Sequence, residues 1–352
     1  MKSLIKKAVF AFCYYSGLWL LFRFLNRNKI AVLMYHGVTD KDINCWTQLP
    51  KDKFEIQMRY ISRNYSPRHL TDAAKILRRD IAPSKYAIVV TFDDGFNNNM
   101  TTAYPILKRY SIPAIIFLAT SFVDKNPRFA GLLWTDYILA LFRNTGLKQV
   151  DLSDINLGKY DLINLQDRHQ AKETVCRALK KLNYDEKNRI IEIISSRLGN
   201  KISSDDYEIF RSLDWQDVSV LSKERLIEFG AHTVNHEILS RMPKNAAEKE
   251  ISDSQITIGK ATGKPVSFFA YPNGTRADFN NETKAIAAEH FKCALTTIEG
   301  LNSIGSDMYE LKRINIGNDI SMMEFKLLIS GTVDFIRRFM SGTNKSYCKS
   351  GH

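Results

Sequence analysis

Short apolar runs recur along the chain from Ile30 onward, and longer segments of mixed polar and apolar residues separate them. Several runs contain no polar residue, such as IAVLM at Ile30–Met34 and AIIFLA at Ala114–Ala119. Continuous apolar runs of this length are typical of parallel strands that are buried on both faces. The pattern predicts seven strands, at Ile30–Met34, Ala87–Phe92, Ala114–Ala119, Ile227–Ala231, Ser267–Ala270, Lys292–Thr297 and Lys312–Ile316.

Segments with the spacing of amphipathic helices lie between most of these strands. The clearest are Phe54–Asn64, Leu70–Arg79, Asn98–Tyr110 and Asn245–Thr262. Seven alternating units predict an α/β fold, a distorted (β/α)7 barrel of the TIM type with one strand fewer. A doubly wound open sheet is the alternative, but no glycine-rich phosphate loop follows the first strand.

The alternation stops between about residues 121 and 212. This stretch is rich in charge and helical in pattern at Leu132–Arg143, Asp167–Leu182 and Glu186–Leu198. We interpret it as an insertion after the third strand that forms a helical cap beside the barrel mouth. A second independent domain is the alternative, but the stretch has few apolar residues for a core of its own.

The N-terminal region contains an uncharged run, Ala8–Phe22, flanked by Lys6, Lys7 and Arg23. As a helix, its 15 residues span about 22 Å, less than the roughly 30 Å of a bilayer's hydrocarbon core. We predict that residues 1–29 form an amphipathic helix on a membrane surface. A helix packed on the protein's own core and a short signal anchor are the alternatives. The barrel is expected over residues 30–340, followed by a flexible polar tail at 341–352.

The composition and net charge of the chain limit the kinds of molecule that it is expected to bind. The chain has 50 Lys and Arg against 38 Asp and Glu, a net charge of +12, which suits anionic lipid or an acidic substrate. Nucleic acid is disfavoured because the charge is spread out and no basic-aromatic motif is present. The five cysteines form no CxxC pair, which disfavours a zinc ribbon or a disulfide scaffold and favours a reducing compartment.

Two polar motifs follow predicted strands, where a barrel places its active site. Asp93-Asp94-Gly95 follows the second strand, so one carboxylate can bind a metal while the other faces substrate. His232-Thr-Val-Asn-His236 follows the fourth strand, and an i, i+4 pair on a helical turn brings two imidazoles to one metal. Alone, the first motif is also typical of an Asp-Gly turn and the second of surface or core histidines. Together they give two histidines and one carboxylate, the donor set of an open catalytic metal site.

Two further strand ends contribute candidates. Phe268–Gly274 (FFAYPNG) ends in a Pro-Asn-Gly turn that could aim the backbone N–H of Tyr271 at a developing oxyanion, although an ordinary turn has the same sequence. His36 in the MYHGV segment follows the first strand. It is a candidate general acid because a histidine has a near-neutral pKa, the alternative being a core histidine.

Three motifs carry a resemblance to a known family. TFDDG at Thr91–Gly95, HTVNH at His232–His236 and AYPNG at Ala270–Gly274 occur in the order and approximate spacing of the polysaccharide deacetylases, carbohydrate esterase family 4. The resemblance runs from about Ile30 to Ile316. It implies a distorted (β/α)7 barrel that removes N- or O-acetyl groups from sugars with a divalent metal, usually zinc.

The resemblance also implies roles for individual residues. Asp94, His232 and His236 would bind the metal, and Asp93 would be the base that deprotonates the activated water. The main-chain N–H of Tyr271 would contribute to the oxyanion hole.

The catalytic acid departs from the common family pattern. Many members carry it in a late Leu-x-His motif, but only His290 and His352 follow His236, and neither context matches. The MYHGV segment instead resembles the circularly permuted subgroup that includes bacterial poly-N-acetylglucosamine deacetylases. In that subgroup the acid comes from the first strand, which assigns the role to His36.

The arginine that orients the base also departs from the pattern. Many members have it in the third motif, where this chain has Phe268 and Phe269. We predict that Arg313, on the seventh strand, takes its place.

The leading hypothesis is metal-dependent removal of the N-acetyl group from a sugar in a glycan or lipid-linked glycan. Deformylation, or another amide hydrolysis on a lipid-linked sugar, is an alternative, and a non-catalytic glycan-binding component of a membrane assembly complex is another. A non-heme iron oxygenase shares the donor set but is disfavoured by the adjacent Asp93. The layout resembles deacetylases of bacterial exopolysaccharide and O-antigen gene clusters. We therefore expect association with the bacterial inner membrane, with the cytoplasmic face favoured over the periplasmic, and we leave the oligomeric state open.

Overall fold

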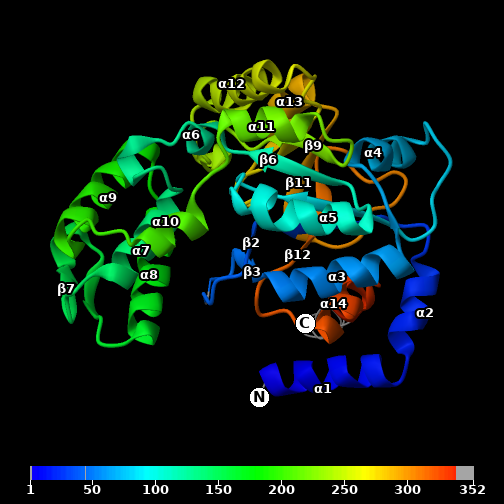
Figure 1. The fold of residues 1–352 in the computed structure, drawn as a ribbon, viewed down its shortest axis with the longest axis horizontal. Coiled ribbons are helices and arrows are strands. Elements are labelled where there is room, and N and C mark those ends of the chain that lie inside the picture. Colours follow the sequence, from blue (N-terminus) through cyan, green and yellow to red (C-terminus); the bar gives the residue numbers. More distant parts are fainter. Residues whose placement is uncertain (1, 44, 338–352) are drawn as a thin grey trace, which may run out of the picture.

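Seven parallel strands form a closed barrel in the computed structural model, which describes residues 2–43 and 45–337 (Figure 1). Each strand pairs with its neighbours in the sequence, and the first strand pairs with both the second and the last, which closes the sheet. The predicted (β/α)7 barrel is confirmed. Its strands are β1 (Ala31–Tyr35), β5 (Ala87–Phe92), β6 (Ala114–Leu118), β9 (Ile227–Ala231), β10 (Phe268–Ala270), β11 (Cys293–Glu299) and β12 (Leu311–Asn315).

β1, β5 and β6 are buried on both faces because consecutive residues enter different hydrophobic clusters. In β5, Val90 packs with the surrounding helices, in a cluster that includes Phe54, while Val89 lies in a second cluster with Ile115 and Leu295. Burying one such side chain contributes about 1.5–3 kcal/mol, so the continuous apolar runs are the main source of the barrel's stability.

Helices cover the outside of the barrel (Figure 1). The predicted helix over Asn98–Tyr110 is divided into a π-helical turn, η1 (Asn99–Ala103), and α5 (Tyr104–Tyr110). The other covering helices are α3 (Lys51–Asn64), α4 (Leu70–Arg78), α6 (Thr120–Val123), α11 (Trp215–Ser222), α12 (Lys244–Thr262), α13 (Asn281–His290) and α14 (Met322–Ile329). Minor elements are β2 (Gly37–Thr39), β3 (Gln48–Pro50), β4 (Ser66–Pro67), and the short 3-10 turns η2 (Pro127–Phe129), η3 (Ser153–Ile155) and η4 (Leu239–Arg241).

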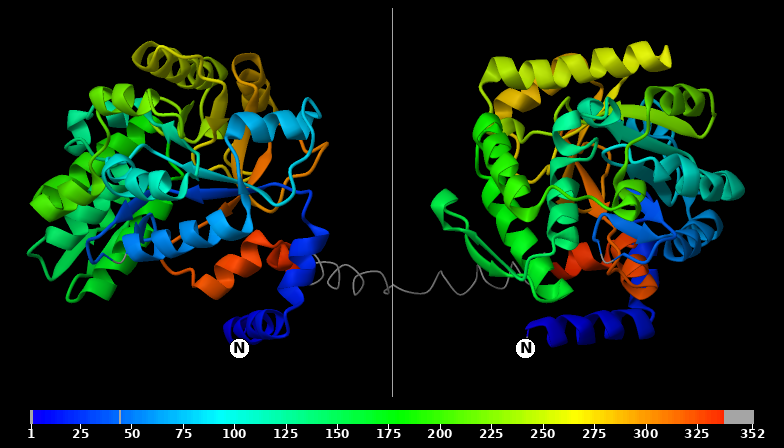
Figure 2. Two further views of the ribbon diagram at one scale, coloured as in Figure 1. Left: turned by 45° about the vertical axis from the view of Figure 1, so that its right-hand side comes forward. Right: turned by 60° about the vertical axis from the view of Figure 1, so that its left-hand side comes forward.

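The segment from α7 to α10, between β6 and β9, forms a separate layer beside the barrel (Figure 2, green). The layer contains α7 (Trp134–Asn144), β7 (Gln149–Leu152), β8 (Gly158–Asp161), α8 (Leu165–Leu179), α9 (Tyr184–Leu198) and α10 (Ser204–Phe210). Its three long helices lie close to the predicted ranges, but the antiparallel β7–β8 hairpin was not predicted.

This layer has its own apolar core, so the expectation that it holds too few apolar residues is wrong. Phe142 of α7, Val175 of α8 and Ile194 of α9 are fully buried in one cluster. α7 is buried over most of its length, whereas α8 and α9 each contribute one apolar stripe that their charged outer faces hide in the composition.

The N-terminal residues form two helices, so the prediction of one continuous helix over Ala8–Phe22 is wrong. α1 (Lys2–Tyr15) and α2 (Leu18–Leu25) meet at 79°, and Gly17 between them has a φ of 75° that favours glycine. Phe10 of α1 is buried in a cluster with Leu327 of α14, as the own-core alternative expected.

The described helices differ in length and hydropathy from a membrane span. No single described helix is long and apolar enough to cross a membrane, and only the bent α1–α2 pair meets the criterion, by length and composition alone. The predicted flexible tail at 341–352 lies outside the described residues.

Candidate functional site

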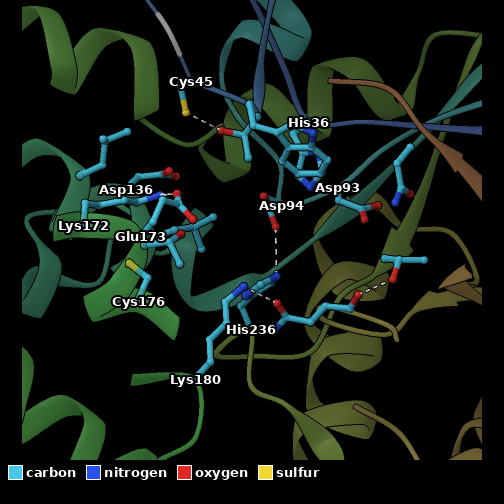
Figure 3. Close-up of a pocket in the computed structure, with 18 of the residues that line it drawn as sticks. His36, Cys45, Asp93, Asp94, Asp136, Lys172, Glu173, Cys176, Lys180 and His236 are labelled. Carbon is cyan, nitrogen blue, oxygen red and sulfur yellow. Dashed lines mark hydrogen bonds and ion pairs between the residues drawn. The ribbon is translucent and has the colours of Figure 1, made fainter. Parts of the chain in front are cut away.

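The predicted site residues meet at one end of the barrel, because the carboxyl ends of parallel strands share one mouth. The turn after β5 is anchored on three sides: Asp93 N–H donates to the Tyr35 carbonyl, and the Asp94 and Gly95 carbonyls accept from the N–H groups of Ala119 and Leu213. A pocket of about 610 Å³ opens here, between the barrel mouth and the insertion. Figure 3 shows Asp93, Asp94, His36 and His236 around it.

Asp94, His232 and His236 lie as a cluster whose ligand atoms are all within 4.8 Å of one another. Asp94 Oδ1 is 3.4 Å from His236 Nε2 and 3.7 Å from His232 Nε2. The Nδ1 atom of His232 lies 2.6 Å from the Ala270 carbonyl, which assigns the proton to Nδ1 and leaves Nε2 free to face Asp94. The structure therefore brings the three predicted ligands together.

The chemistry of this cluster fits a divalent cation. Asp94 Oδ1 is buried and has no hydrogen-bond partner in the described part of the chain, although an unpartnered buried carboxylate oxygen is costly. Burial and the neighbouring Asp93 raise the pKa of Asp94 well above its usual value. A cation bound between Asp94 and the two imidazoles would satisfy this oxygen, and two histidines with one carboxylate leave further coordination positions open.

The backbone around the cluster adopts uncommon conformations. Asp94 has φ 75° and His236 has φ 55°, both in the left-handed region that non-glycine residues seldom occupy. At Gly95 (φ 94°) an added Cβ would lie 2.6 Å from Leu118 Cδ2, so a larger residue would clash. Such conformations persist where the surrounding structure enforces them, and they concentrate at functional sites.

The segment after β9 differs from the prediction. The i, i+4 histidine spacing predicted a helical turn, but residues 232–236 form a loop in which Thr233 has φ 66°. The hydroxyl of Thr233 is buried and has no hydrogen-bond partner among the described residues. The two imidazoles converge because the loop folds back, with their ring centroids 4.8 Å apart.

Glu250 of α12 holds this loop and was missed by the sequence analysis. Its carboxylate accepts hydrogen bonds from the N–H groups of Val234 (2.9 Å) and Asn235 (2.8 Å) and from the Asn235 side chain (2.6 Å). A sequence signal existed: Glu250 lies on the buried helical face shared by Ala247, Ile251 and Ser254. A buried acid in such a stripe requires partners, and here they are the metal-site loop.

A second support reaches the loop from the insertion. Lys187 of α9 donates to Glu237, the residue after His236, in a buried ion pair. The insertion therefore contacts the predicted metal-site loop directly.

Asp93 forms a buried two-point ion pair with Arg313. The guanidinium donates to Oδ1 at 2.6 Å and to Oδ2 at 2.8 Å, and its Nε donates to the Thr296 carbonyl at 2.8 Å. Burial alone would raise the pKa of Asp93, but the charges of Arg313 and His232 outweigh it and lower this pKa to about 2. The structure thus places Arg313 where the sequence analysis expected the residue that orients Asp93.

His36 lines the same pocket, with its ring centroid 5.0 Å from that of Trp46. Its carbonyl accepts a hydrogen bond from the Asn99 side chain at 2.6 Å, which holds the backbone after β1. Burial lowers the pKa of His36 to about 4, and the charge of Asp93 offsets this only in part. The expectation of a near-neutral pKa is therefore wrong.

Tyr271 does not have the free N–H that was predicted. This group donates to the Leu295 carbonyl at 3.0 Å, since it continues the ladder between β10 and β11. The side chain is fully buried and its hydroxyl donates to the Tyr309 carbonyl at 3.2 Å. The prediction that the Tyr271 N–H holds an oxyanion is wrong for this reason; the pocket is lined instead by Asn273 of the same motif.

A seven-stranded parallel barrel with an Asp-His-His cluster and a buried carboxylate at its mouth defines a candidate metal-dependent active site. The sequence model of the polysaccharide deacetylase family matches residues 80–150 and 162–291, more than half of the chain. The chain therefore belongs to the polysaccharide deacetylase family, and the family and hydrolase class predicted from its motifs are confirmed.

Individual relatives agree with this assignment. The Bacillus subtilis (strain 168) protein YxkH, which carries a polysaccharide deacetylase name, is 35% identical over 91 residues. That match covers 26% of this chain and 32% of YxkH, so it spans about a third of that relative.

Solved structures show the same fold. The Streptococcus pyogenes deacetylase PplD, in complex with acetate, has a TM-score of 0.57 at 19% identity, covering 86% of this chain and 98% of that one. IcaB from Ammonifex degensii has a TM-score of 0.55 at 16% identity, covering 86% and 97%. At these identities the likeness concerns the fold alone, and membership of the circularly permuted subgroup stays a prediction.

Proposed function

We propose that this protein is a metal-dependent deacetylase that hydrolyses the N-acetyl amide of a sugar in a glycan or lipid-linked glycan. The observation that carries the proposal is the pairing of Asp93 with Arg313 directly beside the Asp94, His232 and His236 cluster. Such a pair holds one carboxylate ionised and oriented next to three metal ligands, the arrangement that amide hydrolysis by an activated water requires.

Asp94, His232 and His236 would hold the cation, and two imidazoles with one carboxylate suit zinc. When bound, such a cation acidifies a water molecule and polarises the acyl carbonyl. All three ligand side chains are held by strand ends or loops of the barrel, so the site is formed before substrate arrives.

Asp93 would act as the base. With a pKa of about 2 it is ionised, and therefore able to accept a proton, throughout the physiological pH range. Arg313 fixes the carboxylate plane at two points, so the oxygen that accepts the proton has a defined direction.

His36 would protonate the leaving amine. Its pKa of about 4 means that the imidazole is neutral at pH 7, so it must gain a proton during turnover. The proton that Asp93 takes from the attacking water is the one that His36 would receive and pass to the amine. Negative charge that develops on the acyl oxygen raises the proton affinity of a nearby imidazole, which favours this transfer once the tetrahedral species has formed.

The test is acyl release by the purified protein from N-acetylhexosamine oligomers and from lipid-linked N-acetylated glycans. We expect acetate release that stops on chelation and returns with zinc. Chromatographic separation of acetate from formate identifies the acyl group. Full zinc-dependent activity in Asp94→Asn would contradict the site assignment.

We also propose that α1 and α2 attach the protein to an anionic membrane surface. Their outward side chains leave a large apolar area in water: Phe12, Tyr15, Leu20, Leu21, Phe24 and Leu25 are each at least half exposed. Lys6 and Lys7 of α1 are exposed as well, which suits anionic lipid headgroups, whereas Arg23 is turned inward to the Asn64 carbonyl. The described cysteines are all free, which supports the cytoplasmic face of a bacterial inner membrane.

Vesicle flotation tests this attachment. The wild type should float with vesicles containing anionic phospholipid and less with neutral vesicles, and the double variant Leu21→Ser/Phe24→Ser should lose flotation. Ile256→Ser on α12 is the matched control, because Ile256 is similarly exposed but lies far along the chain. Equal flotation of the double variant and the wild type would rule out this surface.

A further inference from the structure

Helix α8 of the insertion presents basic side chains to the pocket. Lys172, Cys176 and Lys180 recur at every fourth residue and therefore lie along one helix face, with Arg177 beside them, and all four line the pocket. Figure 3 shows Lys172 and Lys180 in the same pocket as Asp94 and His236. The insertion thus contributes a wall of a cavity whose chemistry belongs to the barrel.

Of these four side chains, Lys180 is the one that contacts the turn after β10 at the barrel mouth. Its Nζ donates to Asn273 Oδ1 at 2.7 Å, on the turn after β10. Lys180 lines the cavity that His36 and His236 share, and its charge contributes to lowering the pKa values of both imidazoles.

Lys180 has no ion-pair partner among the described residues, since no carboxylate lies within 4.0 Å of its Nζ. The charges of Asp278 and Glu173 act on it only from a greater distance, and burial outweighs them and lowers its pKa. Burying an ammonium without a counter-charge is unfavourable. A lysine kept in this state at a substrate cavity gains its partner when an anion binds.

The neighbouring charges on α8 do not cancel this excess. Lys172 is paired with Glu173 at 2.9 Å, but Arg177 has no partner in the described part of the chain. Asp136 of α7 lies on the same wall, and burial raises its pKa to about 7, so it carries only part of a negative charge at neutral pH. Lys180 and Arg177 therefore remain the two cations of this wall without an ion-pair partner in the part of the chain that the structure describes.

We propose that Lys180 and Arg177 form an anion-binding subsite, and that the acylated sugar carries a phosphate or carboxylate group close to the acyl group. This inference rests on the proposed function, since it identifies the substrate class of the same pocket. Ammonium and guanidinium groups bind both anions through charge-assisted hydrogen bonds, so the two sources share one recognition chemistry.

The experiment compares three substrates that share one N-acetylhexosamine: a neutral methyl glycoside, a glycosyl phosphodiester and a disaccharide with a neighbouring uronic acid. The measured quantity is the selectivity ratio, kcat/KM for an anionic substrate divided by kcat/KM for the neutral one. The wild type should prefer at least one anionic substrate, and added salt should weaken that preference. The preferred member identifies phosphate or carboxylate as the source.

Three variants test the residues. Lys180→Gln retains a hydrogen-bonding end and should lower the selectivity ratio about ten- to a hundred-fold, the size expected for one charge-assisted hydrogen bond. Arg177→Gln should lower it about three- to ten-fold because the guanidinium is exposed. Lys181→Gln is the matched control, since this neighbouring lysine is exposed and does not line the pocket; it should keep the wild-type ratio.

Calorimetric binding of hexosamine 1-phosphate and of free hexosamine to the zinc-loaded wild type and variants separates the two proposals. If no substrate is hydrolysed but the phosphate binds more tightly in a Lys180-dependent way, the proposed function fails and the subsite stands. An unchanged ratio in Lys180→Gln would overturn the subsite. An equal fall of kcat for all three substrates would also overturn it, because Lys180 would then act on the reacting acyl group.

Discussion

On the barrel side of the pocket, Asp93 is held at two points by Arg313 and His232 is held by the Ala270 carbonyl. On the insertion side, Lys180 and Arg177 have no carboxylate partner among the described residues. Both walls are charged, but only the first has its charges compensated and fixed by the protein. The comparison indicates that the barrel supplies prearranged chemistry, while the insertion supplies groups whose partners arrive with the substrate.

The largest expected effect is on the barrel side. Asp93→Asn should lower kcat about 10²- to 10⁴-fold for every substrate, because a general base is lost. The variant should still bind one zinc ion, measured by metal analysis after dialysis, since Asp93 is not among the three clustered ligands. Asp253→Asn, at an exposed position on α12, is the control. If kcat fell only for anionic substrates, Asp93 would take part in recognising the anion, and the division of roles between the barrel side and the insertion side would be wrong.

The insertion side should show its own pH dependence of stability. Asp136 is buried, one of its oxygens lacks a partner in the described residues, and its pKa is raised to about 7. Between about pH 4 and pH 7 the folded protein keeps a proton on Asp136 that the unfolded chain releases, so this group lowers the free energy of unfolding as pH rises. Asp136→Asn should remove that decline, which amounts to at most about 4 kcal/mol.

Urea unfolding of wild type and Asp136→Asn at pH 5 and pH 8 checks this. The variant should gain more stability relative to the wild type at pH 8 than at pH 5, because most of the decline lies between these two pH values. Parallel curves with no difference between the two pH values would show that Asp136 is not held protonated by burial.

A smaller effect is expected at the support of the metal-site loop. Glu250→Gln removes the charged acceptor of two backbone N–H groups and should weaken zinc affinity about 10- to 100-fold, as for other groups that orient metal ligands. Competition with a chromophoric chelator measures this. Glu248→Gln on the exposed side of α12 is the control. Zinc affinity equal to the wild type would mean that the loop holds its shape without Glu250.

The smallest effect concerns the turn that carries the two aspartates. Gly95→Ala should destabilise the protein by about 1–3 kcal/mol, because alanine is strained at φ 94° and its Cβ would contact Leu118. Thermal unfolding checks the change. Gly146→Ala is a suitable comparison, since an added Cβ there meets nothing within 4 Å. If Gly95→Ala and the wild type had equal melting temperatures, the turn would accommodate alanine without loss of stability.

Much of the barrel could be predicted because its signal is local. The bounds of β5 agree with the predicted strand, since a strand buried on both faces is apolar almost throughout. The bounds of β9 agree as well, although this strand contains the partly exposed Glu228. The core of the insertion was missed because α8 and α9 each show only one apolar stripe, and these stripes become a core when they pack against the largely buried α7. The bend at Gly17 was missed because hydropathy does not report backbone conformation.

The candidate site also has features that could be predicted from the sequence and features that could not. The donor types and their order along the chain are present in TFDDG and HTVNH, so the Asp94, His232 and His236 cluster could be predicted. The use of the Tyr271 N–H in the sheet and the low pKa of His36 could not, because strand register and burial arise from distant residues.

The sequence by itself determined the family, the seven strands and the side chains available for chemistry, because apolar runs and motif residues are properties of short segments. Only the tertiary structure decided which groups compensate one another. Arg313 reaches Asp93 from a strand 220 residues away, Glu250 reaches the histidine loop from a helix, and α8 places Lys180 beside Asn273 without a counter-charge. Charge compensation and burial depend on contacts between segments far apart in the chain, and the local pattern of residues does not contain them.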